Sequence, residues 1–373
     1  MKPLDIQFWR SAEEVESNRA IWEDLYWASG SSPYLSYEWF STALKYFQRD
    51  NRLYVGLMKV DQRPVAIVPL EIVKKKIGPL TLNILQFALG GWTLRNGAIV
   101  REGMDELLAI REVINALKAE KLHWVFCILS KCPISLLTDK NKKQYCSLPD
   151  DIAAVMAGRT VVIETPDTWK AYQKTLSKTH RSNISWRKNV LGRRGEVKAI
   201  RCYLNPVLDP GKLDTLMNDA VFVSRNSWQH EAQEGWAISD PKTGDFFIDV
   251  SHRLAARGML DLSVLYLDNQ PISFIWGPGR GQHTTSYKVG YDKSFSRFSP
   301  GLVHLAKHIE DSIERGVKTI DLGPEFFEYK SSWGKRHDEL ATIYISSWNP
   351  AVFHYLHKVK KTFTKFRKRS VHK

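Results

Sequence analysis

Three small residues, Ser299-Pro300-Gly301, open the stretch of the chain best suited to chemistry. Ser299 is a natural helix N-cap, and Pro300 is favoured at the first helical position. Gly301 has no side chain, so a ligand can approach the unpaired N–H groups at the positive end of the helix. The triplet therefore predicts an anion site suited to a phosphate or pyrophosphate. The same triplet also opens purely structural helices, so both interpretations stand on the sequence.

The segment that follows must be helical for this site to exist. Apolar residues recur there at helical spacing, which predicts one buried face formed by Leu302, Leu305, Ala306, Ile309 and Ile313. Gly316 then supplies a left-handed stop. Residues 283–291 before the helix and 317–322 after it read as strands. A loop over 292–298 leads into the helix, whose N-terminus then lies beside a strand end, where ligands commonly bind.

The ordered series of motifs resembles the GNAT superfamily of acyltransferases. The series is Tyr291-Asp292, Ser299-Pro300-Gly301, Gly316, Asp321-Leu322-Gly323, Tyr329-Lys330 and Trp333, preceded by Leu176-Ser177-Lys178, Arg181 and Ser227-Trp228. The most similar branch is the acetyltransferase-like family associated with cellulose and exopolysaccharide biosynthesis, which is akin to the Fem-type peptidyltransferases. The resemblance covers residues 160–335 and, more loosely, the first 70. At Gly323-Pro324-Glu325 the chain departs from the family, which more often has Gly, a basic residue and Gly.

Transfer of an acyl group from a thioester requires a cradle for the CoA pyrophosphate and donors that polarise the thioester carbonyl. We assign the cradle to Arg297, Ser299, Pro300 and Gly301, with Arg297 either contacting phosphate or facing solvent. The resemblance implies that backbone N–H groups near Val289 and Tyr291 polarise the carbonyl. Acetyl-CoA or another acyl-CoA is therefore the expected co-substrate, and no metal is expected.

The same reaction needs a base for the nucleophile and an acid for the departing thiolate. Asp321 is the candidate base, with Glu325 behind it, because a carboxylate shielded from water can have its pKa raised toward neutrality. The alternative is that Asp321 caps the next turn. Tyr329 is the candidate acid and Tyr291 the reserve, and either could instead be a buried structural tyrosine.

Two residues are candidates for binding the substrate. Lys330 could bind an acidic substrate or a CoA phosphate, and Trp228 could form a wall on the substrate side. A tryptophan on a helix face is more often part of a core, so Trp228 has that alternative.

The composition describes a folded chain with a strong basic bias. The formal net charge is +14, from 54 basic and 40 acidic residues, and it is concentrated in residues 174–201 and in the tail over 351–373. Such segments suit CoA phosphates, tRNA or an anionic membrane surface, or they are solvated faces. The tail also has the pattern of a basic amphipathic helix.

The sequence also limits the compartment and the use of metals. No apolar run of eighteen residues and no apolar signal core occur, so we expect a cytoplasmic protein, which could sit peripherally at the inner membrane face. Cys127, Cys132, Cys146 and Cys202 match no common zinc or disulfide spacing and are expected to be reduced thiols. His304 and His308 lack the intervening pattern of a zinc motif.

Residues 38–69 align without a gap with residues 245–276, and the two segments share a helix, a strand, an Asp-x-x-Pro turn and a second strand. Few aligned pairs are identical, but Fem-type proteins carry two acyltransferase-like halves. The predicted fold is therefore α/β (α+β): tandem GNAT-like domains, each a mixed, mostly antiparallel sheet flanked by helices. We expect a first, non-catalytic domain over 1–150, an acyltransferase domain over 151–350, and the basic helix over 351–373.

Three functions fit these features. The first is an acyl-CoA-dependent N- or O-acyltransferase acting on a sugar, a glycolipid or a polysaccharide precursor. The second is a Fem-type transferase that takes an aminoacyl group from charged tRNA, which the basic segments favour. The third is a non-catalytic module of a polysaccharide-synthesis complex. We rank them in this order.

Overall fold

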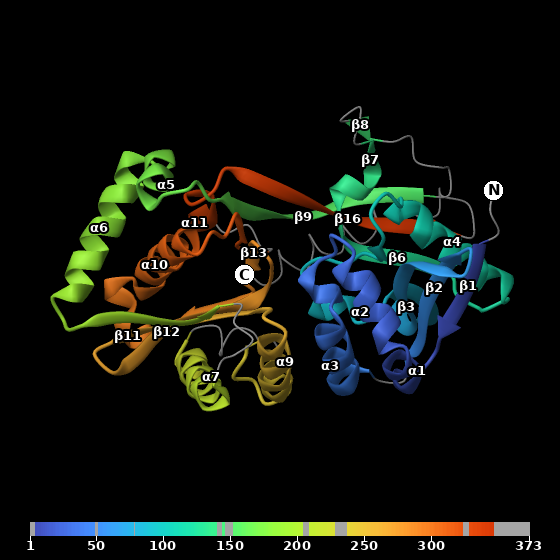
Figure 1. The fold of residues 1–373 in the computed structure, drawn as a ribbon, viewed down its shortest axis with the longest axis horizontal. Helices are drawn as coiled ribbons and strands as arrows, with labels where there is room; N and C mark the ends of the chain where they lie inside the picture. The colour runs from blue at the N-terminus through green and yellow to red at the C-terminus, as the bar shows by residue number, and fades with distance from the viewer. Residues whose placement is uncertain are drawn as a thin grey trace. The chain divides into compact units, whose positions relative to one another are not determined.

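The computed structural model describes residues 4–48, 51–77, 79–139, 144–145, 152–203, 209–227, 237–323 and 328–346 (Figure 1). The chain divides into two compact units. The first unit takes its described residues from Met1–Leu35, Gln48–Ala157 and Glu339–Lys373, and the second comprises Ser36–Phe47 and Gly158–Asp338. The expected helix over 351–373, like Cys146, lies outside the described residues. The domain boundaries at 150 and 350 stay predictions.

The first unit is a mostly antiparallel sheet. Its strand order is β1 (Leu4–Trp9), β2 (Arg52–Val60), β3 (Arg63–Ile77), β4 (Leu80–Phe87), β6 (Phe126–Pro133) and β16 (Arg336–Ser346), with β5 (Ile99–Val100) beside β3. Only the neighbours β4 and β6 are parallel among these pairs. The helices are α1 (Ala12–Ser17), α2 (Arg19–Trp27) and α4 (Glu106–Ala119). Short elements are η1 (Pro33–Leu35), η2 (Gly90–Trp92), η3 (Ile134–Leu137), β7 (Thr138–Asp139) and β8 (Gln144–Tyr145).

The second unit is built on a mixed sheet. Its strand order is β9 (Ile152–Glu164), β15 (Thr319–Asp321), β13 (His283–Thr285), β12 (Gln270–Arg280), β11 (Leu260–Leu267) and β10 (Val197–Tyr203), with β14 (Lys288–Tyr291) also beside β12. Its helices are α3 (Tyr37–Phe47), α5 (Trp169–Thr175), α6 (Lys178–Gly192), α7 (Pro210–Arg225), α9 (Gly244–Ala256), η4 (Lys293–Phe298), α10 (Pro300–Glu314) and α11 (Glu328–Ser331). In Figure 1, α5, α6 and α10 lie on one side of β11 and β12, and α7 and α9 lie on the other.

The helices on the α10 side share one core. Tyr172 of α5, Ile184 of α6 and Ile309 of α10 are buried together against Ile320 of β15. This confirms the apolar stripe predicted after Gly301, since its Leu305, Ala306, Ile309 and Ile313 belong to the same cluster. Burying such a face holds α10 on the sheet and fixes the position of its first turn.

Helix α3 belongs to the second unit although it precedes the first hairpin in the chain. Trp39 is 1% exposed and lies edge-to-face against Phe246, with 5.5 Å between ring centroids. Its ring also contacts Trp276 and Tyr287. Lys45 forms an ion pair of 2.6 Å with Asp249 on α9. The aromatic contacts and the ion pair together attach α3 to the face of the second unit that α9 covers.

The predicted internal repeat is visible in the backbone. Helices α3 and α9 begin at aligned positions, and each is followed by a hairpin, β2–β3 and β11–β12. Asp61 and Asp268 open the two turns with positive φ angles of 50° and 54°. The register shifts within the hairpins also coincide in the alignment, at Met58/Lys59 and at Leu265/Tyr266. Because a bulge is a specific local feature, its recurrence at the aligned position confirms the tandem architecture.

The first unit has a helix where the second has α10. Helix α4 connects the parallel neighbours β4 and β6, as α10 connects the parallel neighbours β13 and β15. Its start differs in charge, because Asp105 caps Leu108 N–H and Glu106 accepts a hydrogen bond from Ala98 N–H. Two carboxylates at a helix N-terminus repel a phosphate. This difference supports the proposal that the first unit is non-catalytic.

Two helical regions of the chain are interrupted at polar residues. The region over 13–27 forms α1 and α2, which meet at Asn18. The region after Pro166 forms α5 and α6, and Ser177 caps the second by accepting from His180 N–H at 3.1 Å. Gly316 adopts the predicted left-handed conformation, with φ 74°. Cys127, Cys132 and Cys202 are free and buried. Within the described part of the chain, no helix is long and apolar enough to cross a membrane.

Candidate active site

The most distinctive feature of the second unit is a strand that loses one of its two neighbours part-way along its length. The backbone over 283–291 first pairs as β13 with β12 on one side and, in parallel, with β15 on the other, where Thr285 lies opposite Asp321. Ser286 N–H still bonds the Asp321 carbonyl at 2.8 Å, but Tyr287 N–H bonds the Trp276 carbonyl of β12. From there β14 pairs only with β12 in the described part of the chain. The two parallel strands therefore separate at Ser286, and β14 presents an open edge.

Alternation along the strand shows which donors face this edge. Asp292 N–H bonds the Ile272 carbonyl, and Ser273 Oγ bonds the Gly290 carbonyl, so Gly290 and Asp292 face β12. Successive backbone groups of a strand point to opposite sides, so the N–H groups of Val289 and Tyr291 point outward. These are the two positions predicted to polarise a carbonyl. A ligand that lay along β14 could therefore accept hydrogen bonds from these two N–H groups.

The start of α10 lies against the same strand. An added Cβ at Gly301 would come 3.3 Å from Cδ1 of Tyr291, so the first turn of the helix packs on the end of β14. A glycine is therefore favoured at position 301 for packing as well as for access of a ligand. Leu302 N–H and Val303 N–H both bond the Ser299 carbonyl. Pro300 has no N–H, which leaves Gly301 N–H as the donor of the first turn best placed for a ligand.

Ser299 differs from its predicted role as a side-chain cap. It adopts the left-handed conformation, with φ and ψ both 54°, and its side chain makes no capping hydrogen bond. The short helix η4, capped by Asp292 through Ser294 N–H, precedes it and turns the chain directly into α10. The sharp turn at Ser299 therefore comes from η4 and Pro300, and the Ser299 hydroxyl does not cap the N-terminus of α10.

Basic groups gather around η4. The guanidinium of Arg297 lies over the Phe298 ring, 4.5 Å from its centroid, and that of Arg194 lies 5.2 Å from the same ring. Arg187 Nη1 donates to the Arg297 carbonyl at 2.6 Å. Three arginines thus contact or belong to residues 297–298, just before α10, and their positive charge favours an anionic ligand there.

Asp321 lies at the point where the two strands separate. Its carboxylate accepts a hydrogen bond of 2.9 Å from Gly323 N–H, which is the turn-capping alternative that the sequence left open. Ser286, across the strand pair, is 5% exposed, and its hydroxyl finds no partner among the described residues. Ser286 was not predicted from the sequence, because a serine within a strand of serines and threonines carries no distinguishing signal.

Tyr329 and Lys330 follow on α11 and have different surroundings. Tyr329 is 51% exposed, and desolvation of its hydroxyl raises its pKa, so the phenol is protonated at neutral pH. Lys330 is 7% exposed, and its Nζ donates to the Gly323 carbonyl at 3.4 Å. Lys330 therefore braces the turn that Asp321 caps, and its role toward a substrate stays a prediction. Glu325 and Trp228 lie outside the described residues.

Buried polar groups beneath α10 support β14 from behind. Ser273 Oγ donates to the Gly290 carbonyl and so must accept from Nδ1 of His304, at 3.0 Å. Nε2 of His304 then accepts from the Ser263 hydroxyl at 2.8 Å. His304 is fully buried, which lowers its pKa well below the ordinary value and keeps it neutral. This chain of hydrogen bonds fixes the strand whose outer edge is open.

A buried ion pair lies one turn further along α10. Arg201 of β10 contacts Asp261 of β11 through two hydrogen bonds of 2.7 Å, and both side chains are almost fully buried. Burial alone would raise the pKa of Asp261, but the Arg201 guanidinium outweighs it and holds the pKa below its usual value. Arg201 also contacts Asp311, while burial and Arg201 lower the pKa of His308 to about 4. The signal in the sequence is an aspartate inside an apolar strand, Asp261, and the pair was not predicted from it.

Several basic side chains of the cluster over 174–201 form hydrogen bonds or ion pairs with other groups of the protein. Arg181 bonds the carbonyls of Gln173 and Leu176, where α5 ends. Lys188 pairs with Glu310 at 2.9 Å, and Arg201 is buried as described. The cluster therefore contributes less free positive surface than the sequence suggests.

The comparisons with known proteins agree with this geometry. Residues 178–331 match the model of a family described as an acetyltransferase (GNAT) domain. The second unit contains a GNAT-type domain. The match runs from α6 to α11, so it includes the separating strands and the α10 start. A search of the curated proteins found no match. No group of three or more His, Cys, Asp or Glu side chains in the described residues could hold a metal ion.

Two solved structures are similar in fold to nearly the whole chain, and so to both of its units. FemX is 12% identical, with a TM-score of 0.56, over 90% of this chain and 98% of FemX. L-PGS from Bacillus licheniformis is 12% identical, with a TM-score of 0.53, over 93% of this chain and 96% of L-PGS. At such low identity these likenesses establish the fold alone. They agree with the tandem, Fem-type architecture predicted from the repeat.

Proposed function

We propose that this protein is an acyl-CoA-dependent acyltransferase that modifies a sugar, a glycolipid or a polysaccharide precursor, with acetyl-CoA as the first donor to test. The observation that carries the proposal is the junction of β14 and α10. The outward N–H groups of Val289 and Tyr291 lie on the strand against which Gly301 packs. An extended thioester can bond that edge while its pyrophosphate meets the helix start and the nearby arginines.

The reaction is direct attack without a covalent enzyme intermediate. The amine or hydroxyl of the acceptor attacks the thioester carbonyl carbon, a C–N or C–O bond forms, and the C–S bond breaks. Asp321 takes the proton of the nucleophile and releases it to solvent, while the CoA thiolate receives a proton from Tyr329, which regains one from solvent. The backbone donors of β14 stabilise the negative charge that develops on the carbonyl oxygen.

The binding step is tested by isothermal titration of acetyl-CoA into the wild-type protein and into Gly301→Glu. The added Cβ would crowd Tyr291 at 3.3 Å, and the carboxylate would place negative charge at the helix start, so we expect binding to be lost. Gly192→Glu is the matched control, because Gly192 ends α6 with no atom within 4 Å of an added Cβ. No binding of acetyl-CoA to the wild type, with the protein folded, would refute the CoA donor.

The catalytic step is tested with Asp321→Asn. Asparagine keeps an oxygen that can cap Gly323 N–H but cannot act as a base, so we expect kcat to fall by about 10²–10⁴ with acetyl-CoA affinity unchanged. Asp167→Asn serves as the control, because Asp167 is almost fully exposed. Unchanged turnover in Asp321→Asn would leave Asp321 with the capping role alone.

The tRNA alternative keeps the fold and changes the donor. The internal use of Arg181, Lys188 and Arg201 weakens the case made by the basic cluster, so we place this alternative second. If acetyl-CoA does not bind, displacement of a labelled aminoacyl-tRNA is the next measurement. A pathway in cellulose or exopolysaccharide synthesis is supported by the family resemblance, and acetylation of such precursors would test it.

A further inference from the structure

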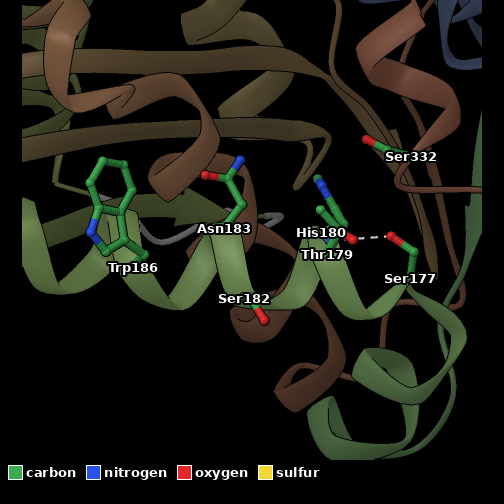
Figure 2. Close-up of a pocket in the computed structure, with 7 residues that line it drawn as sticks. All are labelled: Ser177, Thr179, His180, Ser182, Asn183, Trp186 and Ser332. Atoms are coloured by element: carbon green, nitrogen blue, oxygen red, sulfur yellow. Dashed lines mark hydrogen bonds between the residues drawn. The ribbon is translucent and has the colours of Figure 1, made fainter.

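A shallow, open hollow of about 620 Å³ lies along α6. Figure 2 shows His180, Asn183 and Trp186 rising from the same side of the helix, with Ser332 beyond α11 across from them. Ser177 and Thr179 close the end nearest α5, and Ser182 also belongs to the lining. The volume falls within the range of about 300–1,000 Å³ typical of small-molecule sites.

The lining of this hollow is polar but uncharged. Hydroxyl groups come from Ser177, Thr179, Ser182 and Ser332, an amide comes from Asn183, and among the described residues no carboxylate, ammonium or guanidinium lines the hollow. The imidazole of His180 packs edge-to-face against Trp333, with 4.6 Å between centroids, and desolvation lowers its pKa, so it is neutral at pH 7. Such a surface suits a neutral ligand that both donates and accepts hydrogen bonds.

Trp186 gives the hollow a flat apolar wall. Its side chain is 54% exposed although it lies on a strongly polar helix, where neither core packing nor helix propensity requires a tryptophan. The guanidinium of Arg187 lies 4.4 Å from the ring centroid, which disfavours a cationic ligand beside it. An exposed ring flanked by hydroxyl and amide groups matches a sugar, whose C–H face is apolar and whose rim is hydroxylated.

The hollow also leads toward the proposed donor site. Arg187, the residue after Trp186, donates to the carbonyl of Arg297, two residues before Ser299. Asn183 and His180 lie one and two turns earlier on the same side of α6. A ring seated over Trp186 would therefore lie next to the loop that opens α10.

We propose that this hollow binds a sugar ring of the acyl acceptor, with Trp186 as the stacking platform and Asn183 as a hydrogen-bond partner of the ring hydroxyls. The inference rests on the proposed function, because it names the acceptor class of that reaction. The same ring could belong to a free monosaccharide, an oligosaccharide or the headgroup of a glycolipid.

The test is saturation-transfer NMR and isothermal titration with four probes. These are D-glucosamine, cellotetraose, vesicles of a glucosyl-diacylglycerol in phosphatidylcholine, and glycerol as a polyol without a ring. We expect binding of at least one sugar probe and not of glycerol, a loss of at least tenfold in Trp186→Ala, and retention in Trp186→Phe. Asn183→Ala should weaken the same probe. Trp27→Ala removes another exposed tryptophan and should change nothing. The probe bound most tightly identifies the source of the ring.

Acetyl-CoA is titrated into the same variants to separate the two proposals. Trp186→Ala should bind acetyl-CoA as the wild type does, since it leaves β14 and α10 intact. If acetyl-CoA binds but no sugar probe does, or if sugar binding survives in Trp186→Ala, the hollow is not a sugar site while the acyltransferase proposal stands. If sugars bind through Trp186 and acetyl-CoA does not, the sugar site stands and the donor assignment fails.

Discussion

At the scale of single residues, the buried pair Arg201–Asp261 is the interaction most sensitive to change. Both side chains lie out of water, 4% and 2% exposed, so each depends on the other for compensation of its charge. We expect Arg201→Met to lower the free energy of unfolding by about 3–5 kcal/mol, because it leaves the Asp261 carboxylate buried without its partner. Urea denaturation followed by tryptophan fluorescence measures this.

The control for that substitution is Arg315→Ala. Arg315 pairs with Asp311 on the surface of α10, 43% exposed, and should cost less than about 1 kcal/mol. Combining Arg201→Met with Asp261→Leu removes both charges and should recover part of the loss. If Arg201→Met and Arg315→Ala lowered the free energy of unfolding equally, the buried pair would be no more important for stability than the surface pair.

The buried histidines give the stability a defined pH dependence. His308 has a pKa of about 4 when folded, whereas an unfolded histidine titrates near 6.5. Between these values the unfolded state binds a proton that the folded state does not, so stability falls as the pH drops from about 6.5 to 4. Each such histidine contributes at most about 1.4 kcal/mol per pH unit.

This dependence is measured by urea midpoints at several pH values. His308→Gln should flatten the slope between pH 6.5 and 4, whereas the exposed His123→Gln should leave it unchanged. The loss of stability caused by protonation of Asp261 occurs at lower pH, because the pKa of this carboxyl is held below its ordinary value. A slope that is the same in His308→Gln and in the wild type would contradict the neutral, buried state of His308.

At the scale of elements, β14 should tolerate proline only at positions whose N–H points away from β12. Val289→Pro removes an outward N–H, and a proline is compatible with a strand when its N–H side faces away from the ladder. We expect acetyl-CoA affinity to fall by at least tenfold, with the free energy of unfolding changed by less than about 1 kcal/mol. Titration and urea denaturation of the same preparation provide both values.

Gly290→Pro provides the contrast. The Gly290 backbone faces β12, so this substitution breaks the ladder, and Gly290 also packs against Phe274, leaving no room for a side chain. It should destabilise the protein strongly. If Val289→Pro bound acetyl-CoA as the wild type does, β14 would have no role as a donor edge.

At the scale of the whole molecule, the second unit depends on a helix from the start of the chain. Trp39 of α3 is buried among Phe246, Trp276 and Tyr287. Trp39→Ala should therefore cost about 3–5 kcal/mol, although residue 39 lies within the first sequence domain. The exposed Trp27→Ala should cost less than about 1 kcal/mol.

A fragment of residues 151–350 is the complementary test. It retains the matched GNAT domain but lacks α3, so it should bind the dye ANS and show little near-ultraviolet circular dichroism. Adding a peptide of residues 36–48 should restore part of that signal. A native-like spectrum from the fragment alone would show that α3 is dispensable.

The sequence by itself predicted the elements around the candidate site and the repeated helix and hairpin. Local rules placed α10 from its apolar spacing and its Gly316 stop, and the hairpins from their Asp-x-x-Pro turns. These features depend on residues close together in the chain, which is why periodicity and capping could find them. The tandem fold followed from the repeat and the family resemblance.

Only the tertiary structure decided which residues meet. The separation of β14 from β15 at Ser286, the packing of Tyr291 on Gly301 and the pairing of Arg201 with Asp261 each join residues distant in sequence. The allocation of α3 to the second unit and the capping of Gly323 by Asp321 were likewise decided by packing and hydrogen-bond satisfaction. Pattern reasoning cannot reach such contacts, because burial and pairing depend on how the sheet brings distant segments together.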